Sequence, residues 1–516
     1  MTVDELYYEA AECFKAKNFD AALTLVHKLQ KISPNHKQAR MIELCVWHER
    51  ENCVREVAVL EKLLPQLDPS LPDEKSLRAD ALNFLGMNMS KLARPDEAVK
   101  FLRMSARLSK NNAAACTQIS NALFVANASE KFSRADFAEL YAEYKSYLSD
   151  VTPFAPKTYA HKKIRVGFVS GDFYSHPVMS WCLPMVTRLD KKFFVTHCYS
   201  TGTFRDVATD YIRGFVDVWR DISDMTDFDA AKLIRDDEID ILFDLSGHTS
   251  GGRLRVAAYK PATVQISGIG YMNSTGLDCF DCFLSDVHCA GDESYFVEKV
   301  LRLPNSHVCY TPPPELEISE PPCLRKGFVT FGSFNNFAKI TDTVLTAWKE
   351  ILDRVPESRL LLKHKIFDTA DDKQFVKQRL QTFGFDLRRV EMRGYSTNYL
   401  REYNDIDVAL DTFPYTGGVT TCEALWLGVP VVSLYGNRHG TRFGLSMLTN
   451  VDLAELAVAT VEEYVARAVM LANDSELLTL LRRNLREMMK NSPLMDATTY
   501  VRDVERVFKQ ILIRGR

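Results

Sequence analysis

The sequence predicts an α/β protein made of two doubly wound halves, preceded by an all-helical domain. The first part of the chain holds amphipathic segments and few strand patterns. From Lys163 onward, short apolar runs alternate with amphipathic segments, which is typical of parallel sheets whose strands are connected by helices. Proline clusters at 312–314 and 321–322 interrupt this alternation before it restarts. The predicted units are helices at 1–150, a linker at 151–162, an N-terminal half at 163–320, a C-terminal half at 321–495 and a final helix within 496–516.

Composition limits the class of protein. A chain of 516 residues is too long for one compact core, and 46% hydrophobic with 26% charged residues is typical of globular proteins. The net charge of −4 is spread over both signs, so we expect no nucleic-acid surface. No apolar run is long enough to span a membrane, and the polar start Met1–Leu6 is unlike a signal peptide, so we expect a cytoplasmic protein. The basic run Arg482-Arg483 with Arg486 is expected to be a solvated helix face.

The helical region resembles tetratricopeptide repeats. Tyr7–Phe14 and Phe19–His27 predict two amphipathic helices around a short turn. A similar pair contains Ala98, which lies 76 positions after the equivalent Ala22. That spacing is about two repeats of roughly 34 residues, so a degenerate repeat is expected between them, near Val54–Leu67. A plain helical bundle remains the alternative. One further helix is expected at 136–148.

Twelve cysteines without a regular spacing predict reduced thiols. One group, Cys279-Phe-Asp-Cys282 followed by His288-Cys289, has a spacing that a zinc or redox site could use. Large apolar residues surround it, which favours a packed strand edge with buried thiols. We therefore expect no metal site.

The segment Asp411–Leu434 reads as a phosphate-binding corner. A short apolar run, Ile406–Leu410, predicts a buried strand that ends at the start of this segment. A glycine loop through Gly418 follows, and Thr420-Thr421 stand where a helix can begin. Glycines let a ligand approach the backbone, and free N–H groups at a helix N-terminus hold an anion. On spacing alone, an ordinary strand-to-helix crossover without a ligand is the alternative.

Together with Phe331–Thr341, this segment closely resembles the O-GlcNAc transferase and SPINDLY family of protein O-glycosyltransferases. The match extends over about Lys163–Val507 and is nearer to the SPINDLY branch. The resemblance implies a GT-B fold, in which two Rossmann-like halves hold a nucleotide sugar in the cleft between them. Further matching blocks are Val166–Phe173, His176-Pro177, Asp244–Thr249, Arg302–Pro304 and Asp411–Pro430.

The resemblance assigns donor contacts to the C-terminal half. Lys339 matches the family's essential lysine and is expected to place positive charge on the β-phosphate. Asn336 matches a position that contacts the nucleotide. Thr420 and Thr421 match the paired threonines that cap the diphosphate, and Glu423 resembles the acidic residue on the ribose.

Two positions depart from the family pattern. Val419 stands where many members have histidine or threonine, and Tyr399 stands where a histidine near the donor is usual. Both bear on which donor is used. Gly418 is expected to let the donor approach, and Arg442, with its neighbour Arg438, to border the phosphate site. A charged surface loop is the alternative for the two arginines.

The N-terminal half is expected to face the acceptor. His176 matches an active-site histidine of the family and is a candidate general base, with a positioning role as the alternative. His248 is the second candidate, and Asp244 is expected to orient or replace it. Both lie at the C-terminal end of a predicted strand, where cleft residues belong.

The leading hypothesis is an inverting, metal-independent glycosyltransferase that moves a sugar to Ser or Thr of a protein. UDP-GlcNAc is the favoured donor, no other cofactor is expected, and flagellin or another surface protein is a candidate acceptor. A SPINDLY-like fucosyltransferase that uses GDP-fucose is one alternative. A degenerate adaptor, favoured by Val419 and Tyr399, is another, and a small-molecule transferase or epimerase explains the helical domain less well. Self-association through the helical domain stays open.

Overall fold

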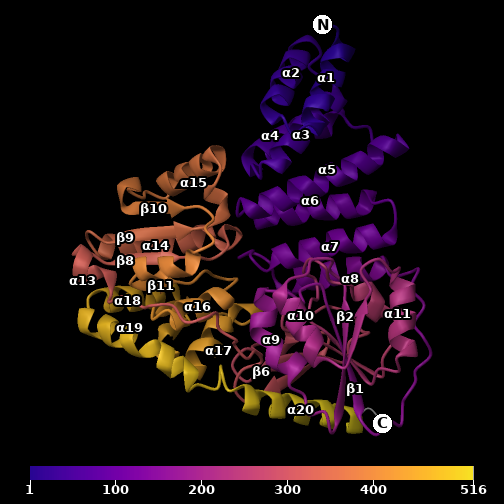
Figure 1. The fold of residues 1–516 in the computed structure, drawn as a ribbon. Helices are drawn as coiled ribbons and strands as arrows, with labels where there is room; N and C mark the ends of the chain where they lie inside the picture. Colours follow the sequence, from indigo (N-terminus) through magenta and orange to yellow (C-terminus); the bar gives the residue numbers. More distant parts are fainter. Residues whose placement is uncertain (515–516) are drawn as a thin grey trace.

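The computed structural model describes residues 1–514 and has three parts (Figure 1). A helical array leads into two α/β halves, and the last helix lies beneath the N-terminal half. The array consists of α1 (Val3–Lys15), α2 (Phe19–Ile32), α3 (Lys37–Glu49), α4 (Cys53–Leu63), α5 (Pro72–Lys91), α6 (Pro95–Leu108), α7 (Asn112–Ala126) and α8 (Arg134–Ser146).

The array repeats one turn geometry. Lys17, Glu51 and Ala93 each adopt a left-handed backbone conformation, and each lies in the turn between the two helices of a pair. Glu51 follows Lys17 by 34 positions, the length of one tetratricopeptide repeat. The intervening pair, α3 and α4, occupies the place where a degenerate repeat was predicted. The recurrence favours the repeat interpretation over a plain bundle.

The array contacts both halves. Asn127, at the end of α7, donates from Nδ2 to the Tyr271 hydroxyl at 3.3 Å, and Arg255 pairs with Asp150 at 2.8 Å. On the other side, the N–H groups of Cys53 and Val54 donate to the Asp372 carboxylate at 3.1 and 2.8 Å. The hydrophobic core runs without a break from α4 through both halves. The later helices of the array are therefore packed into the same core as the two halves.

The N-terminal half is a seven-stranded parallel sheet with the order β3-β2-β1-β4-β5-β6-β7. All four strands expected here are present. β6 lies where a packed strand edge was expected, whereas β3, which is short and partly exposed, and β7 were not predicted. The strands are β1 (Ile164–Ser170), β2 (Phe194–Ser200), β3 (Val218–Asp221), β4 (Ile241–Asp244), β5 (Val264–Ser267), β6 (Cys282–Asp286) and β7 (Lys299–Leu303). The helices are α9 (Pro177–Thr187), α10 (Val207–Phe215), α11 (Asp227–Asp236) and α12 (Leu254–Ala258).

The C-terminal half repeats the same plan with six parallel strands in the order β10-β9-β8-β11-β12-β13. This is the Rossmann order, and its switch point lies between β8 and β11. The strands are β8 (Thr330–Ser333), β9 (Arg359–Lys363), β10 (Val390–Arg393), β11 (Val408–Leu410), β12 (Val431–Leu434) and β13 (Ala457–Val458). The helices are α13 (Pro322–Lys326), α14 (Asp342–Arg354), α15 (Ala370–Thr382), α16 (Val419–Trp426), α17 (Phe443–Asn450), α18 (Val461–Ala472) and α19 (Ser475–Lys490). The predicted fold of two doubly wound halves behind a helical domain is confirmed.

The predicted final helix is α20 (Ala497–Arg514), which returns to the N-terminal half (Figure 1). The Phe508 ring packs against Phe194 and Phe243, with ring centroids 6.4 and 6.2 Å apart. The Tyr500 hydroxyl donates to the His307 carbonyl at 3.0 Å. The helix thus ties the two halves on the side away from the helical array. In the part of the chain that the structure describes, no helix is long and apolar enough to cross a bilayer.

The prediction of a solvated basic face on α19 is wrong for Arg482. Only 2% of this residue is exposed. Its guanidinium donates to the carbonyls of Ser319 and Ile406 at 2.9 and 3.0 Å. The side chain therefore satisfies carbonyls of the inter-half linker and of the segment before β11, which sequence periodicity alone does not reveal. Arg486 is also partly buried, against Trp426, whereas Arg483 is exposed as expected.

We expect the Arg482→Ala variant to lose about 3 kcal/mol of stability, because several buried carbonyls lose their donor at once. Arg483→Ala is the matched control: its ion pair with Glu320 is exposed, so a change within about 0.5 kcal/mol is expected. Denaturant unfolding of the two variants measures the difference. Equal midpoints would show that the buried guanidinium contributes nothing to stability.

Candidate active site

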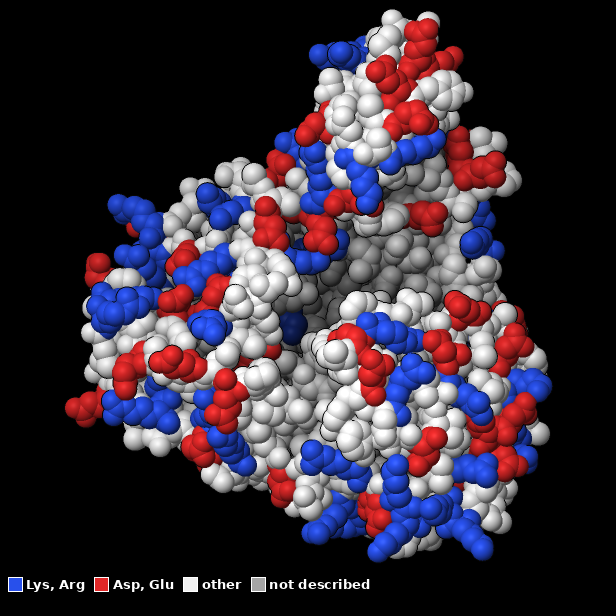
Figure 2. All heavy atoms as spheres, in the orientation of Figure 1, with Lys and Arg blue, Asp and Glu red and all other residues white. Residues whose placement is uncertain are grey.

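A cleft of about 700 Å³ opens between the two halves and the helical array. Its walls come from loops at the C-terminal ends of β1, β4, β8 and β11, which is where ligands bind in open α/β sheets. Asn121 and Phe124 of α7 close the side toward the array. Figure 2 shows the hollow between the three parts, with walls that are mostly uncharged.

The Asp411 carboxylate organises the loop after β11. It is 1% exposed, and its Oδ1 accepts from the N–H groups of Gly417 at 2.6 Å and Thr412 at 2.8 Å. The same oxygen accepts from Asn335 Nδ2 at 3.3 Å, and Oδ2 accepts from Ser433 Oγ at 2.6 Å. These donors come from three different strand ends. The buried carboxylate therefore fixes the loop against both neighbouring strands.

The loop places the N-terminus of α16 at the cleft, where its first N–H groups are not capped by a described side chain. Gly418 is the N-cap, and no side chain among residues 1–514 caps the helix. The N–H groups of Val419 and Thr420 have no acceptor within the described chain, and both residues line the cleft. Thr420 Oγ1 donates to Asn335 Oδ1 at 3.1 Å. Thr421 is buried behind it, outside the lining. Open N–H groups and the helix dipole suit a phosphate.

Lys339 supplies the positive charge. Of the described residues that line the cleft, it is the only lysine or arginine. Its Nζ donates to the Thr416 carbonyl at 3.0 Å and lies 3.7 Å from the Tyr415 ring centroid. Burial lowers the pKa of Lys339 to about 8, opposed by the Asp411 charge. The ammonium is thus still the main form at neutral pH, held in the same cleft as the start of α16. The predicted contact residues Asn336 and Gly418 also line this cleft.

Glu423 and Tyr399 form a pair beside the cleft. The Tyr399 hydroxyl donates to Glu423 Oε1 at 2.6 Å. Burial raises the pKa of Glu423 to about 7, although the hydroxyls of Tyr399 and Tyr403 oppose this. Neither Glu423 nor Tyr399 belongs to the described lining. A ribose contact for Glu423 therefore stays a prediction.

His176 lies at the N-cap of α9 and lines the cleft. Its Nδ1 accepts from the Val178 N–H at 3.3 Å and lies 3.7 Å from Asp172 Oδ2. Burial lowers the pKa of His176, and Asp172 opposes this. With Nδ1 as an acceptor, the neutral ring carries its proton on Nε2 and is a donor there. This arrangement supports the positioning role, and a base role stays a prediction.

The geometry of His248 supports a structural role. Its Nε2–H donates to the Thr275 carbonyl at 2.9 Å, and Nδ1 accepts from Ser120 Oγ at 2.8 Å, so both ring nitrogens are engaged. Burial lowers its pKa to about 4. Asp244 lies outside the described lining and accepts from Gly247 N and Ser267 Oγ, each at 2.8 Å. His248 thus contacts α7 through Ser120, and Asp244 holds the loop after β4 through Gly247.

Unlike His248, which lines the cleft, the two arginines after β12 lie outside its described lining. Arg442 donates from Nε to the His288 carbonyl at 2.7 Å and from Nη1 to the Gly436 carbonyl at 2.8 Å. Arg438 is buried, with its guanidinium carbon 5.2 Å from the Phe137 ring centroid. Neither belongs to the described lining. The loop faces the seam between the halves, so the structure does not bring these arginines to the predicted phosphate position.

Several site residues were missed from sequence. Asn335 joins Asp411 to Thr420, and its only signal was its place next to Asn336. Trp181 of α9 lies so close to the loop between β11 and α16 that a Cβ on Gly418 would lie 2.4 Å from its ring. No local pattern marked Trp181, because its contact partner lies in the other half of the molecule.

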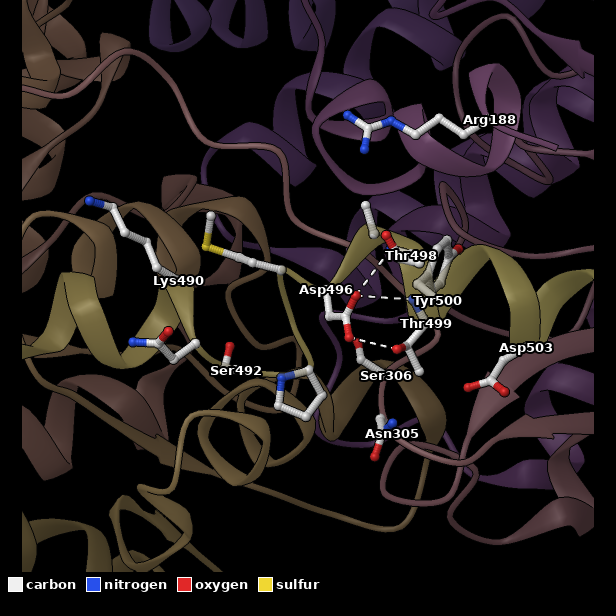
Figure 3. Close-up of a pocket in the computed structure, with 14 residues that line it drawn as sticks. Arg188, Asn305, Ser306, Lys490, Ser492, Asp496, Thr498, Thr499, Tyr500 and Asp503 are labelled. Carbon is white, nitrogen blue, oxygen red and sulfur yellow. Dashed lines mark hydrogen bonds between the residues drawn. The ribbon is translucent and has the colours of Figure 1, made fainter. Parts of the chain in front are cut away.

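A second cavity, of about 540 Å³, lies beside the start of α20 (Figure 3). Its central carboxylate, Asp496, accepts from the N–H groups of Thr498 and Thr499 and so begins the helix. None of the described residues that line it was predicted as a site residue. The cleft between the halves is therefore the candidate active site.

Two Rossmann-like halves with a ligand cleft between them define a GT-B glycosyltransferase fold. The family model of glycosyl transferase family 41 matches residues 137–309 and 322–504, which is more than half of the chain. The chain belongs to this family.

Similar proteins agree with this assignment. The probable UDP-N-acetylglucosamine–peptide N-acetylglucosaminyltransferases SPINDLY of Solanum lycopersicum and Arabidopsis thaliana are 37% and 36% identical over 385 residues. These matches cover 73% of this chain and 41% of each relative, so the chain spans about two fifths of their length. A solved mutant of the O-GlcNAc transferase of Thermobaculum terrenum is 28% identical, with a TM-score of 0.83, and covers 99% of this chain and 98% of that one.

We expect Gly418→Ala to cost about 1–3 kcal/mol, because the added methyl group must displace the Trp181 ring from the opposite half. Gly214→Ala in α10 is the control, since nothing lies within 4 Å of its added carbon. Thermal unfolding compares the two variants. A melting temperature of Gly418→Ala at or above that of the control would mean that the two halves separate freely at this contact.

Proposed function

We propose that this protein is an inverting glycosyltransferase that transfers a sugar from a nucleotide donor to Ser or Thr hydroxyls of a protein, without a metal in the chemical step. The observation that carries the proposal is the combination of Lys339 and the open N-terminus of α16 in one cleft. Both belong to segments that resemble the donor site of the family.

In the proposed reaction, an acceptor hydroxyl oxygen attacks the anomeric carbon from the face opposite the leaving group. The bond from this carbon to the diphosphate breaks, and the diphosphate takes the electron pair. Lys339 and the N–H groups of Val419 and Thr420 would stabilise the growing negative charge. Because these groups are fixed before the donor arrives, little reorganisation is needed in the transition state.

The acceptor proton must leave during the attack. Asp172 and His176 are the candidate pair near the N-terminal wall, because both line the cleft. Burial raises the pKa of Asp172, opposed by His176, which favours proton uptake by this carboxylate. We propose that His176 positions the acceptor or donor sugar and that the pair receives the proton.

UDP-GlcNAc is the donor that we propose first, since the plant relatives and the Thermobaculum terrenum protein carry GlcNAc transferase names. GDP-fucose is the second candidate, because the resemblance is nearer to the SPINDLY branch of the family. For the acceptor we propose a polypeptide, because α7 of the array forms one wall of the cleft. Flagellin or another surface protein remains a candidate acceptor. A reducing compartment such as the cytoplasm is supported by cysteines that are all free thiols.

The donor site is tested by calorimetric titration of UDP, GDP and their sugar conjugates without added metal. We expect one nucleotide series to bind, and Lys339→Ala to weaken its binding at least tenfold while the melting temperature stays within a few degrees. Lys349→Ala on α14, which only pairs with Asp353 on the surface, serves as the control. Donor turnover should be lost in Lys339→Ala alone.

Full turnover by Lys339→Ala would overturn the proposed role of this lysine. If the wild-type protein binds neither nucleotide series, the transferase proposal is overturned and the adaptor alternative is left.

The pKa of Lys339 predicts a pH dependence. As pH rises through about 8, the free protein loses the ammonium proton, so its affinity for the diphosphate should fall about tenfold per pH unit above this value. The second ionisation of a terminal phosphate lies near pH 6 and does not interfere. Titration of the selected nucleoside diphosphate between pH 7 and 9.5 measures the effect. Lys339→Ala should bind weakly with no such slope, and the same slope in the variant would assign it to another group.

A further inference from the structure

Three buried side chains from different segments meet at the seam between the halves. Cys289 follows β6, His307 follows β7, and His439 follows β12 in the C-terminal half. One potential ligand atom from each lies within 4.8 Å of the others. None belongs to the described lining of the cleft. Of the cysteine-rich group noted in the sequence, this cluster includes only Cys289. Cys279, Cys282 and His288 are not part of it.

The hydrogen bonds around Asp286 leave one histidine nitrogen free to bind. Asp286 Oδ2 lies 2.6 Å from His307 Nδ1 and also accepts from Ser446 Oγ at 2.9 Å. Its Oδ1 accepts from the N–H groups of His288 and Cys289 at 2.8 and 2.7 Å. A carboxylate with this many donors is ionised, so His307 keeps its proton on Nδ1. The lone pair of His307 then lies on Nε2.

Ring nitrogens of both histidines in this cluster lack side-chain partners among the described residues. His307 Nε2 is buried and has no hydrogen bond among the described residues. Neither ring nitrogen of His439 has a side-chain partner among the described residues, although this residue is only 1% exposed. Its ring interacts with the Met272 backbone, which leaves the other nitrogen for a ligand. Buried polar atoms are almost always paired, and an unpaired group indicates strain, water or an ion. Here one ring nitrogen from each histidine and the Cys289 sulfur lie within 4.8 Å of one another, across the two halves of the molecule.

We propose that Cys289, His307 and His439 bind a divalent cation of the Zn²⁺ class. A thiolate and two imidazoles are the ligands that this borderline-soft ion prefers. The Asp286 contact to Nδ1 is the outer carboxylate that typically orients a metal-binding histidine. The thiolate and Asp286 together balance the two positive charges of the ion.

Binding requires a small closure and the loss of one proton. Ligand atoms at tetrahedral Zn²⁺ lie about 3.3–3.8 Å apart, so the side chains must approach by about 1 Å. The Cys289 thiol donates to the Arg442 carbonyl at 3.4 Å in this structure. On binding, its S–H bond breaks, the proton goes to solvent and the thiolate sulfur donates its electron pair to the metal.

The ion would fasten the two halves next to the donor site. The residue after His439 is Gly440, whose carbonyl accepts from Thr416 Oγ1 at 3.0 Å. The Thr416 carbonyl in turn holds Lys339 Nζ. A cation at the seam thus stabilises the loop that positions the cleft lysine without touching the ligand. The site does not depend on the proposed function.

The test uses the full-length protein without a polyhistidine tag. Elemental analysis is made on the protein as isolated, and again after chelation and titration with Zn²⁺ or Co²⁺. We expect binding of one ion per chain, a melting temperature that rises until one equivalent is reached, and a thiolate-to-cobalt charge-transfer band. Cys289→Ser should lose the band, and His439→Gln should weaken binding at least tenfold. Cys282→Ser, which removes a buried thiol on β6 outside the cluster, should behave as wild type.

Three results would overturn the proposal. One is wild-type protein that binds neither metal at millimolar concentration, which would leave the cluster as aromatic packing around neutral histidines. Another is a cobalt spectrum without the thiolate band, and the third is equal binding by His439→Gln. If Cys289→Ser fails to fold, the wild-type cobalt spectrum and His439→Gln still decide. Nucleotide binding is measured separately, so either proposal can fail alone.

Discussion

The buried carboxylate of Asp411 is the constraint on which the donor side of the cleft depends. It lies at the end of β11 and accepts from a loop amide, a neighbouring asparagine and a serine on the next strand. Burial raises its pKa, and these donors oppose that rise, so the charged form is kept by local hydrogen bonds. These hydrogen bonds hold the loop after β11 in the turn that leads back to the cleft. The positions of Lys339 and of the start of α16 follow from this turn.

The positive potential of the cleft comes from Lys339 and the N-terminus of α16. Its walls are mostly uncharged, which strengthens any electrostatic interaction inside it. Lys339 loses hydration there and gains only a carbonyl, the Tyr415 ring and the distant Asp411 charge. Its lowered pKa reflects this incomplete compensation. An anion in the cleft would supply the missing partner, so the site is arranged for a ligand that carries negative charge.

The helical array and the seam between the halves have a shared role in rigidity. Phe124 of α7 packs edge-on against Tyr415 of the donor loop, with ring centroids 6.2 Å apart. His248 holds Ser120 of the same helix, and Arg442 crosses between the halves to the His288 carbonyl. Polar side chains that looked suitable for catalysis therefore join parts of the molecule. His248 lines the cleft as well, and its buried hydrogen bonds join the cleft wall to α7.

The sequence by itself determined the three-part organisation, most strands and the corner of strand, glycine loop and helix after β11, because periodicity, glycine loops and helix starts are local properties. The family motifs also identified Lys339, Asn336, Gly418 and Thr420, which all line the cleft. Only the tertiary structure decided that Arg482 is buried and that His248 and Arg442 serve packing. It also brought together Trp181 with Gly418, and Cys289 with His439, across the two halves. Burial and hydrogen-bond partners at a seam depend on residues hundreds of positions apart, and no local pattern records them.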